Sequence, residues 1–238
     1  MSEFELYRQY RAKQGREMQL EDWGRAYRWY LRGWLPLDYA SPILDVGCGE
    51  GHLLHALQRW GYRNASGIDL RDEAVAFCRN NRIDATVGDA TDYLANCTSQ
   101  FKLITAIDFL EHLSIERGIT FLNHARGALR PGGSLILQVP NLESPFGGGI
   151  FYGDLTHRTG FTTASLAQML RQAGFEDVEL RGAGPGIWGV LSCGRYLLWQ
   201  GVNALLRICT VIECGSSESA IYTRVMFGRA QVEKRFES

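Results

Sequence analysis

The chain has 238 residues, of which 45% are apolar, and its formal net charge is −1. This is enough apolar chain for one domain with additions, and the near-neutral charge excludes recruitment of nucleic acid by a general basic field. The six cysteines are scattered without a C-x-x-C pair, and residues 1–15 hold no continuous apolar core. We therefore expect reduced thiols and a cytoplasmic location, with neither a secretory leader nor a metal site.

The first element expected is an N-terminal helix with an aromatic face, followed by Pro36. Within residues 16–35, large side chains recur at three- and four-residue spacings, as they do along one face of a helix. These residues are Trp23, Tyr27, Tyr30, Leu31 and Trp34. We assign residues 1–40 to a helical lid over the site, with simple packing of the aromatic face as the alternative.

Residues 43–139 alternate short apolar runs with amphipathic ones. The runs expected to be buried parallel strands are 43–46, 65–69, 85–88, 103–107 and 134–139. The segments with helical spacing between them are 52–60, 71–81 and 116–129, and Gly61 and the Pro131-Gly132-Gly133 run are expected helix stops. This alternation predicts an α/β fold with a doubly wound, mostly parallel sheet.

Further elements are expected after this core. They are a helix from 162 that ends at Gly174, a strand at 176–181, an apolar helical segment at 186–213 and a closing strand at 220–230. We divide this part of the chain into a core of 41–181, a helical insertion of 182–219, and a closing strand and tail of 220–238.

The strongest chemical signal is the glycine-rich turn in "ILDVGCGEGHLL" at 43–54. It follows an apolar strand and precedes a helix, so a ligand can contact backbone beside the positive end of that helix. The G-x-G-x-G spacing differs from the G-x-G-x-x-G of dinucleotide sites. Asp45, Asp69 and Asp89 each lie at the end of one of three successive strands, which predicts a nucleoside ligand at this edge of the sheet. For Asp45, capping of the turn is the alternative.

These motifs resemble those of the class I S-adenosylmethionine-dependent methyltransferases over about residues 41–181. The resemblance lies in "LDVGCGEG", "GIDL", "GDA", "FKLITAIDFLEHL" and "LRPGGSLILQVPN", which occur in the family's order. It implies a seven-stranded sheet whose last strand is antiparallel, and S-adenosylmethionine as the cofactor. The cofactor residues assigned in this way are Asp45, Gly47, Cys48, Gly49, Gly51, Asp69, Leu70, Asp89, Ala90, Ile107 and Phe109.

The loop "YGDLTHRTGF" at 152–161 carries the residues expected to act on the acceptor. A hydroxyl acceptor must lose a proton during methyl transfer, and His157 is the expected base, oriented by Asp154, which is itself a second candidate. Arg158 and Tyr152 are expected to bind the acceptor. His112 is a further catalytic candidate, with a structural or cofactor-side role as the alternative. For the whole segment, the alternative is that the polar residues of the loop only hydrogen-bond to one another and to the backbone.

The arrangement "DLTH…FT…SLAQMLRQAGFEDVEL" resembles methyltransferases that modify bacterial surface polysaccharide and O-antigen. This resemblance implies a sugar hydroxyl of a glycan or glycolipid as the acceptor. From the near-neutral charge we expect no nucleic-acid partner. A quinone or other small-molecule acceptor is the alternative, and a non-catalytic cofactor-binding subunit is another. A homo-oligomer is compatible with each of these readings.

The last apolar segment, 196–213, has large apolar residues at helical spacing, interrupted by Gln200, Asn203 and Arg207. We expect it to pack on the core or on another subunit. The alternative is contact with a membrane surface, which would make the protein peripheral on the inner membrane and suit a lipid-linked acceptor.

Overall fold

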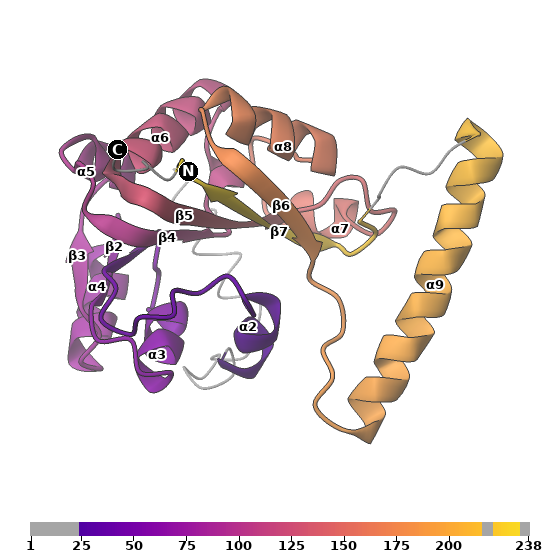
Figure 1. The fold of residues 1–238 in the computed structure, drawn as a ribbon, viewed down its shortest axis with the longest axis horizontal. Coiled ribbons are helices and arrows are strands. Elements are labelled where there is room, and N and C mark those ends of the chain that lie inside the picture. Colours follow the sequence, from indigo (N-terminus) through magenta and orange to yellow (C-terminus); the bar gives the residue numbers. More distant parts are fainter. Residues whose placement is uncertain (1–23, 216–220, 234–238) are drawn as a thin grey trace, which may run out of the picture.

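The protein folds around one seven-stranded sheet with helices on both faces, as seen in a computed structural model that describes residues 24–215 and 221–233 (Figure 1). The strand order is β3-β2-β1-β4-β5-β7-β6, and β7 runs antiparallel to both of its neighbours. The strands are β1 Ile43–Val46, β2 Ala65–Asp69, β3 Ala85–Val87, β4 Phe101–Ile107, β5 Leu129–Pro140, β6 Glu176–Gly182 and β7 Val225–Gln231. The predicted fold class is confirmed.

Two apolar layers hold the helices against the sheet. One layer packs under α2 (Gly24–Tyr30), α3 (His52–Arg59) and α4 (Asp72–Asn80). The other packs under α5 (Ala90–Ala95), α6 (Ile115–Ala128) and α8 (Thr163–Gln172). The central strands β4 and β5 are buried from both sides, which explains why they read as continuous apolar runs rather than as alternating patterns.

Strand β5 begins earlier than predicted. It starts at Leu129, directly after α6, and its pairing with β4 shifts register between the Phe101–Leu129 and Leu103–Ser134 pairs. The Pro131-Gly132-Gly133 run is therefore part of an irregular strand and not the expected helix stop, and Gly132 has a φ of +65°. Three short elements were not predicted: α5, a 3-10 turn η1 (Leu110–His112) and α7 (Gly148–Phe151).

The described part of the expected lid packs on the sheet. Tyr27, Leu31 and Trp34 are buried in the layer that also holds α3, and the Trp34 Nε1–H donates to Glu179 Oε2 over 2.9 Å. Trp23, like the rest of 1–23, lies outside the described residues. The alternative, an aromatic face used for packing, therefore holds for the described residues of this region.

Phe227 of β7 is fully buried and joins this N-terminal segment to the sheet. Its ring stacks on Tyr30 at 5.3 Å between centroids and meets Tyr27 edge-on at 5.9 Å. We expect Phe227→Ala to lower the free energy of unfolding by about 3–5 kcal/mol, because it leaves a cavity at this junction. Urea denaturation measures the change, and Phe77→Ala on the exposed side of α4 is the control, with an expected loss under about 1 kcal/mol. Equal losses for the two variants would contradict this account.

The predicted apolar helix is α9, Val190–Cys214, and it stands apart from the sheet (Figure 1). Ser192 is the one residue of this helix that is buried. Packing of α9 on the core, one of the two expected arrangements, is therefore wrong, because its large aliphatic side chains remain exposed. Packing on another subunit stays a prediction.

Candidate active site

A cavity of about 470 Å³ opens at the carboxyl ends of β1 to β4. Parallel strands present their carboxyl ends at one sheet edge, which is where doubly wound folds bind ligands. The structure places every expected cofactor residue in the cavity wall except Gly51. Those residues are Asp45, Gly47, Cys48, Gly49, Asp69, Leu70, Asp89, Ala90, Ile107 and Phe109.

The glycines of the turn have different physical roles. Gly47 has a φ of +64°, and a Cβ there would lie 2.8 Å from Cδ2 of Phe109, so only glycine fits this close approach. Gly51 has a φ of +75° and begins α3, but a Cβ there would meet the Cys78 Sγ at 2.9 Å. Gly51 therefore serves the packing of the turn on α4, and its contact with the cofactor stays a prediction.

Asp69 at the end of β2 fixes the shape of the glycine turn. Its Oδ2 accepts from the Gly49 N–H at 2.8 Å, and its Oδ1 accepts from the Arg71 backbone N–H at 2.9 Å and from Arg71 Nε at 3.2 Å. Arg71 also lines the cavity, a position that was not predicted from the sequence. One carboxylate thus holds together two walls of the cavity.

Asp89 at the end of β3 caps α5 beside the cavity. Its Oδ1 accepts from the N–H groups of Thr91 and Asp92, and its Oδ2 pairs with Arg117 Nη2 at 2.9 Å. Burial works against ionisation, but the hydrogen bonds from Asp92, Thr91 and Arg117 hold the pKa of Asp89 below its usual value. Its carboxylate is therefore a fixed negative charge on the cavity wall.

Asp45 at the end of β1 is buried, and the Thr105 Oγ1–H donates to its Oδ1 over 2.6 Å. Burial raises the pKa of Asp45 to about 7, although the Thr105 hydrogen bond acts in the opposite direction. Near neutral pH, Asp45 can therefore gain or lose a proton at the cavity floor.

This raised pKa predicts a pH dependence of stability. Because the folded state holds the Asp45 proton more tightly than the unfolded state, its contribution is fully present below about pH 4 and is lost as the pH rises to about 7. We expect Asp45→Asn to be more stable than the wild type above pH 7, by at most about 4 kcal/mol, with the difference shrinking on acidification. Urea denaturation between pH 4 and pH 8 measures it. A difference that is constant with pH, like that expected for the exposed control Asp84→Asn, would contradict the assignment.

Asp108 after β4 is held in an unusual backbone conformation. Its φ is +49°, and its Oδ1 accepts from Gln138 Nε2 at 2.7 Å. The Tyr27 O–H in turn donates to Gln138 Oε1 over 3.0 Å. A non-glycine residue at positive φ is strained and persists only when its surroundings fix it. This chain from α2 through β5 thus positions Asp108 and the neighbouring Phe109, which both line the cavity.

His112 of η1 lines the cavity and is oriented by two residues of the 152–161 loop. The Thr156 O–H donates to Asp154 Oδ1 over 2.7 Å, so Thr156 Oγ1 accepts from His112 Nδ1, which lies 3.0 Å away. Asp154 and Thr156 are both buried. In this arrangement Nδ1 of His112 carries the proton, and Nε2 is the nitrogen that can act as a base.

His157 occupies a different place from the one predicted. Its Nδ1 bonds the backbone oxygen of Phe151 at 2.8 Å, and its ring packs edge-on against His112 at 4.7 Å between centroids. Its side chain is 8% exposed and lies behind the residues that line the cavity. The prediction that Asp154 orients His157 is wrong, since the carboxylate of Asp154 accepts from Thr156 and so supports His112.

Of the two residues expected to bind the acceptor, Arg158 lies in the cavity wall and Tyr152 does not. Arg158 lines the cavity, and its backbone N–H donates to the Glu111 carbonyl over 2.8 Å. Tyr152 is 75% exposed and lies outside the cavity wall. Acceptor contact through Tyr152 within this cavity is therefore not supported, because the residue ends the short helix α7 and points to solvent.

Glu111 is a buried carboxyl group at the centre of this cluster. Neither of its oxygens has a hydrogen-bond partner among the described residues, and Oε1 lies 4.0 Å from His157 Nε2. Burial, followed by the charge of Asp108, raises the pKa of Glu111 well above its usual value. Ligand atoms of Glu111, His112 and His157 lie within 4.8 Å of one another, a group that could hold a metal ion. The expectation of no metal site stays a prediction.

Comparison with known proteins identifies the class of this site. The model of a family described as a methyltransferase domain matches residues 10–180. The chain belongs to this methyltransferase family. Membership confirms the predictions of a methyltransferase and of S-adenosylmethionine as its cofactor, and the predicted core of 41–181 lies almost wholly within the matched residues.

Individual relatives of this methyltransferase differ in their acceptors. This chain is 29% identical over 157 residues to a ubiquinone biosynthesis O-methyltransferase of Thiobacillus denitrificans, and the match covers 59% of this chain and 66% of the relative. It is 27% identical over 149 residues to the dTDP-3-amino-3,4,6-trideoxy-alpha-D-glucopyranose N,N-dimethyltransferase of Streptomyces venezuelae, covering 59% of this chain and 60% of that one. The matches thus span less than two thirds of either relative.

A solved structure shares the fold. The crystal structure of a SAM-dependent methyltransferase from Archaeoglobus fulgidus superposes with a TM-score of 0.65 at 21% identity, covering 90% of this chain and 94% of that one. At this level of identity the likeness concerns the fold alone. It agrees with the fold class predicted from the sequence.

Proposed function

We propose that this methyltransferase methylates a sugar hydroxyl of a bacterial glycan or glycolipid, with His112 as the general base. The observation that carries the proposal is the Asp154–Thr156–His112 series, which ends at the wall of the cavity. A hydroxyl is a poor nucleophile until its proton is taken, and a histidine of fixed tautomer is suited to that step. His157, the base expected from the sequence, serves instead to support the ring of His112.

The residues of the cavity fit the cofactor of the family. Gly47 and Gly49 leave room for close backbone contact, Asp69 and Asp89 offer carboxylates at successive strand ends, and Phe109 gives an apolar surface. The bound cofactor supplies a methyl group on a sulfonium, whose leaving group departs neutral and needs no acid. The task of the protein is then to position the acceptor, to exclude water and to accept its proton.

The polarity of the acceptor side supports a sugar. Apart from Phe109 and Leu113, the wall formed by 108–117 and 156–158 is made of side chains that hydrogen-bond or carry charge. They are Asp108, His112, Ser114, Arg117, Thr156 and Arg158. Such a wall offers donors and acceptors that can bond the hydroxyl groups of a sugar in addition to their partners within the protein. The similarity to the Streptomyces sugar N,N-dimethyltransferase is consistent with this choice.

A phenolic quinone precursor is the second candidate, favoured by the similarity to ubiquinone biosynthesis O-methyltransferases. It would use the same base, because a phenol also loses a proton on methylation. A non-catalytic cofactor-binding subunit is the remaining alternative. Such a subunit would not need the hydrogen bonds from Asp154 through Thr156 that orient His112 beside the cavity. The six free cysteines accord with the cytoplasmic location that we propose.

The acceptor is tested by supplying the purified chain with methyl-labelled S-adenosylmethionine and two separate extracts, one of cell-envelope glycans and glycolipids and one of quinone precursors. We expect label in the glycan fraction as an acid-stable methyl ether. Label in the quinone fraction alone would overturn the sugar assignment and leave the enzyme class intact. The absence of transfer to either extract, with cofactor binding retained, would favour the non-catalytic reading.

A further inference from the structure

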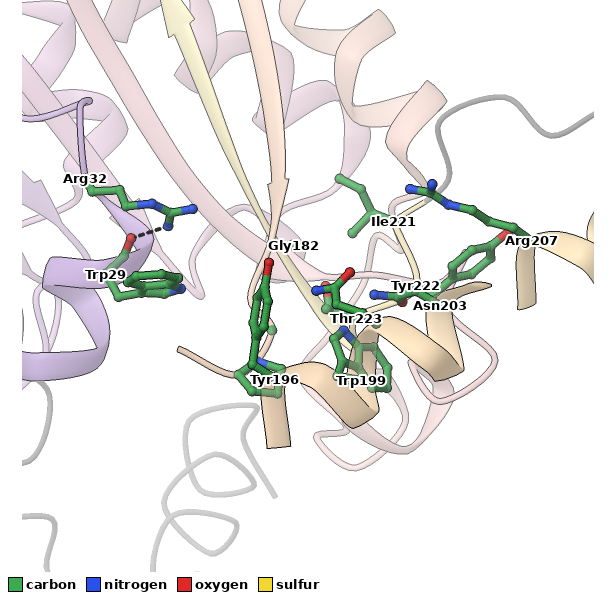
Figure 2. Close-up of a pocket in the computed structure, with 13 residues that line it drawn as sticks. Trp29, Arg32, Gly182, Tyr196, Trp199, Asn203, Arg207, Ile221, Tyr222 and Thr223 are labelled. Carbon is green, nitrogen blue, oxygen red and sulfur yellow. Dashed lines mark hydrogen bonds between the residues drawn. The ribbon is translucent and has the colours of Figure 1, made fainter. Parts of the chain in front are cut away.

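A second cavity, of about 210 Å³, lies between α9 and the body of the protein (Figure 2). Its walls come from the N-terminal segment, the end of β6, α9 and residues 221–223 before β7, and it shares no described lining residue with the cofactor cavity. Strand β6 runs parallel to β5, so its carboxyl end lies at the same sheet edge as the active site. The two cavities are therefore separate sites along one edge.

The side of α9 that lines the second cavity is polar and aromatic. Tyr196, Trp199, Asn203 and Arg207 recur at spacings of three and four residues, which places them with Gln200 on one face of the helix. By length and composition alone, α9 is apolar enough to cross a membrane. A spanning position would bring these polar groups into hydrocarbon, so the cavity side of α9 suits a polar ligand better.

Hydrogen bonds within the protein fix the wall opposite α9. The Asn141 Nδ2–H donates to the Thr223 carbonyl over 2.9 Å, and the Ser144 O–H donates to the Tyr222 carbonyl over 2.7 Å. The Tyr222 hydroxyl lies 2.9 Å from Thr210 Oγ1, which ties α9 to this wall. The cavity is thus formed by the protein alone, and a ligand need not order these groups on binding.

Aromatic rings and amide groups lie together in the cavity in the way that a sugar requires. A Cβ at Gly184 would lie 3.3 Å from Trp199 Nε1, so the indole lies close against the backbone that follows β6. Its ring and that of Tyr196 offer flat surfaces on which the C–H face of a sugar ring packs. The amides of Gln200 and Asn203 offer donors and acceptors for the sugar hydroxyls.

The cavity also carries positive charge. Arg32 and Arg207 line it, at opposite ends in Figure 2, and none of its described lining residues is acidic. Within the described chain, neither arginine forms a salt bridge. The Arg32 guanidinium lies 4.2 Å from the centre of the Trp29 ring and donates to the Trp29 carbonyl over 2.6 Å, which leaves Arg207 more open to a ligand. Guanidinium groups bind carboxylates and phosphates through paired hydrogen bonds, so the charge favours an anionic ligand.

We propose that the second cavity binds a sugar ring that carries a carboxylate or a phosphate, as a unit of the acceptor remote from the one that is methylated. The ring packs on Trp199, and its anionic group pairs with Arg207. Sites for drug-sized ligands measure roughly 300–1,000 Å³, so the 210 Å³ here suits a single ring. The proposal rests on the proposed function, because it takes the acceptor to be a glycan, and it gives that glycan a charge.

Ligand-observed NMR titration of the full-length protein tests the proposal without methyl transfer. The probes are glucuronic acid, glucose 1-phosphate and glucose, each with S-adenosylhomocysteine present. We expect both anionic sugars to bind with a Kd on the order of 1 mM, and glucose to bind at least about fivefold more weakly. The stronger of the two anionic probes then shows which anionic group is recognised.

Variants assign the binding to this cavity. Trp199→Ala should weaken binding of both anionic sugars at least about tenfold, and Arg207→Gln should remove their advantage over glucose. Leu198→Ala is the matched control on α9, because this residue is 75% exposed and does not line the cavity, and it should bind as the wild type does. The Kd of each variant for S-adenosylhomocysteine shows whether the fold is kept.

Four results would overturn the proposal. They are absence of binding of both anionic sugars, equal binding of glucose, unchanged binding by a folded Trp199→Ala variant, and displacement of the bound sugar by thymidine diphosphate at a lower concentration. The last result would identify a nucleotide site, since a nucleobase also stacks on an indole. Failure of the proposed acceptor appears instead as label in the quinone extract, so the two failures are distinguishable.

Discussion

Replacement of His112 by alanine is expected to lower kcat by roughly two to four orders of magnitude while cofactor affinity stays near that of the wild type. His112 lines the cavity, and its Nδ1 is bonded through Thr156 to Asp154, so Nε2 is presented as the base. Steady-state assays with labelled S-adenosylmethionine measure the loss.

Variants of His157 and Thr156 test the roles of these two residues separately from that of His112. His157→Ala should lose much less than His112→Ala, because His157 bonds the Phe151 carbonyl and lies behind the cavity wall. Thr156→Val should lower kcat by about tenfold through misorientation of His112, and Thr156→Ser should restore it. Near-normal turnover of His112→Ala, or an equal or greater loss in His157→Ala, would return the role of base to His157.

Replacement of Asp69 by alanine is the second change with a large expected effect, on cofactor affinity. The Asp69 carboxylate accepts the Gly49 N–H and two N–H groups of Arg71, so its loss frees the glycine turn and one wall of the cavity. Hydrogen bonds to a charged group contribute about 1.5–3 kcal/mol. We therefore expect the Kd for S-adenosylmethionine to rise roughly 10- to 100-fold.

Isothermal titration calorimetry measures this change, with Asp72→Ala as the matched control. Asp72 is exposed in the first turn of α4, three residues from Asp69, and should bind the cofactor as the wild type does. Thermal denaturation of both variants shows whether the fold is kept. An unchanged Kd in a folded Asp69→Ala variant would remove Asp69 from the cofactor site.

The sheet and its cofactor edge were predictable because their signals are local. Each acidic residue lies at or just after the end of its own apolar strand. The carboxyl ends of parallel strands meet at one edge whatever the details of packing. Asp45, Asp69 and Asp89 therefore lie in one cavity as expected. The packing of Gly51 could not be predicted, because its neighbours Cys78 and Ile83 come from distant sequence.

The acceptor side could not be predicted in the same way. His112 in η1 and Thr156 in the later loop meet only through tertiary packing, and sequence proximity suggested the wrong pairing of Asp154 with His157. The side of α9 that faces the body was equally hidden. Its polar residues can be seen in the sequence. The sequence does not show that Tyr196 and Arg207 line the same cavity as Trp29 and Arg32. Long-range contacts of this kind leave no periodic signal.

The central claim is that the cavity at the carboxyl edge of β1 to β4 is built for S-adenosylmethionine. Its most direct test is calorimetric titration of the wild-type chain with S-adenosylmethionine, S-adenosylhomocysteine and NAD in separate runs. The account predicts one site per chain for each of the two sulfur compounds and no measurable binding of NAD. Binding of NAD without binding of either sulfur compound would contradict it.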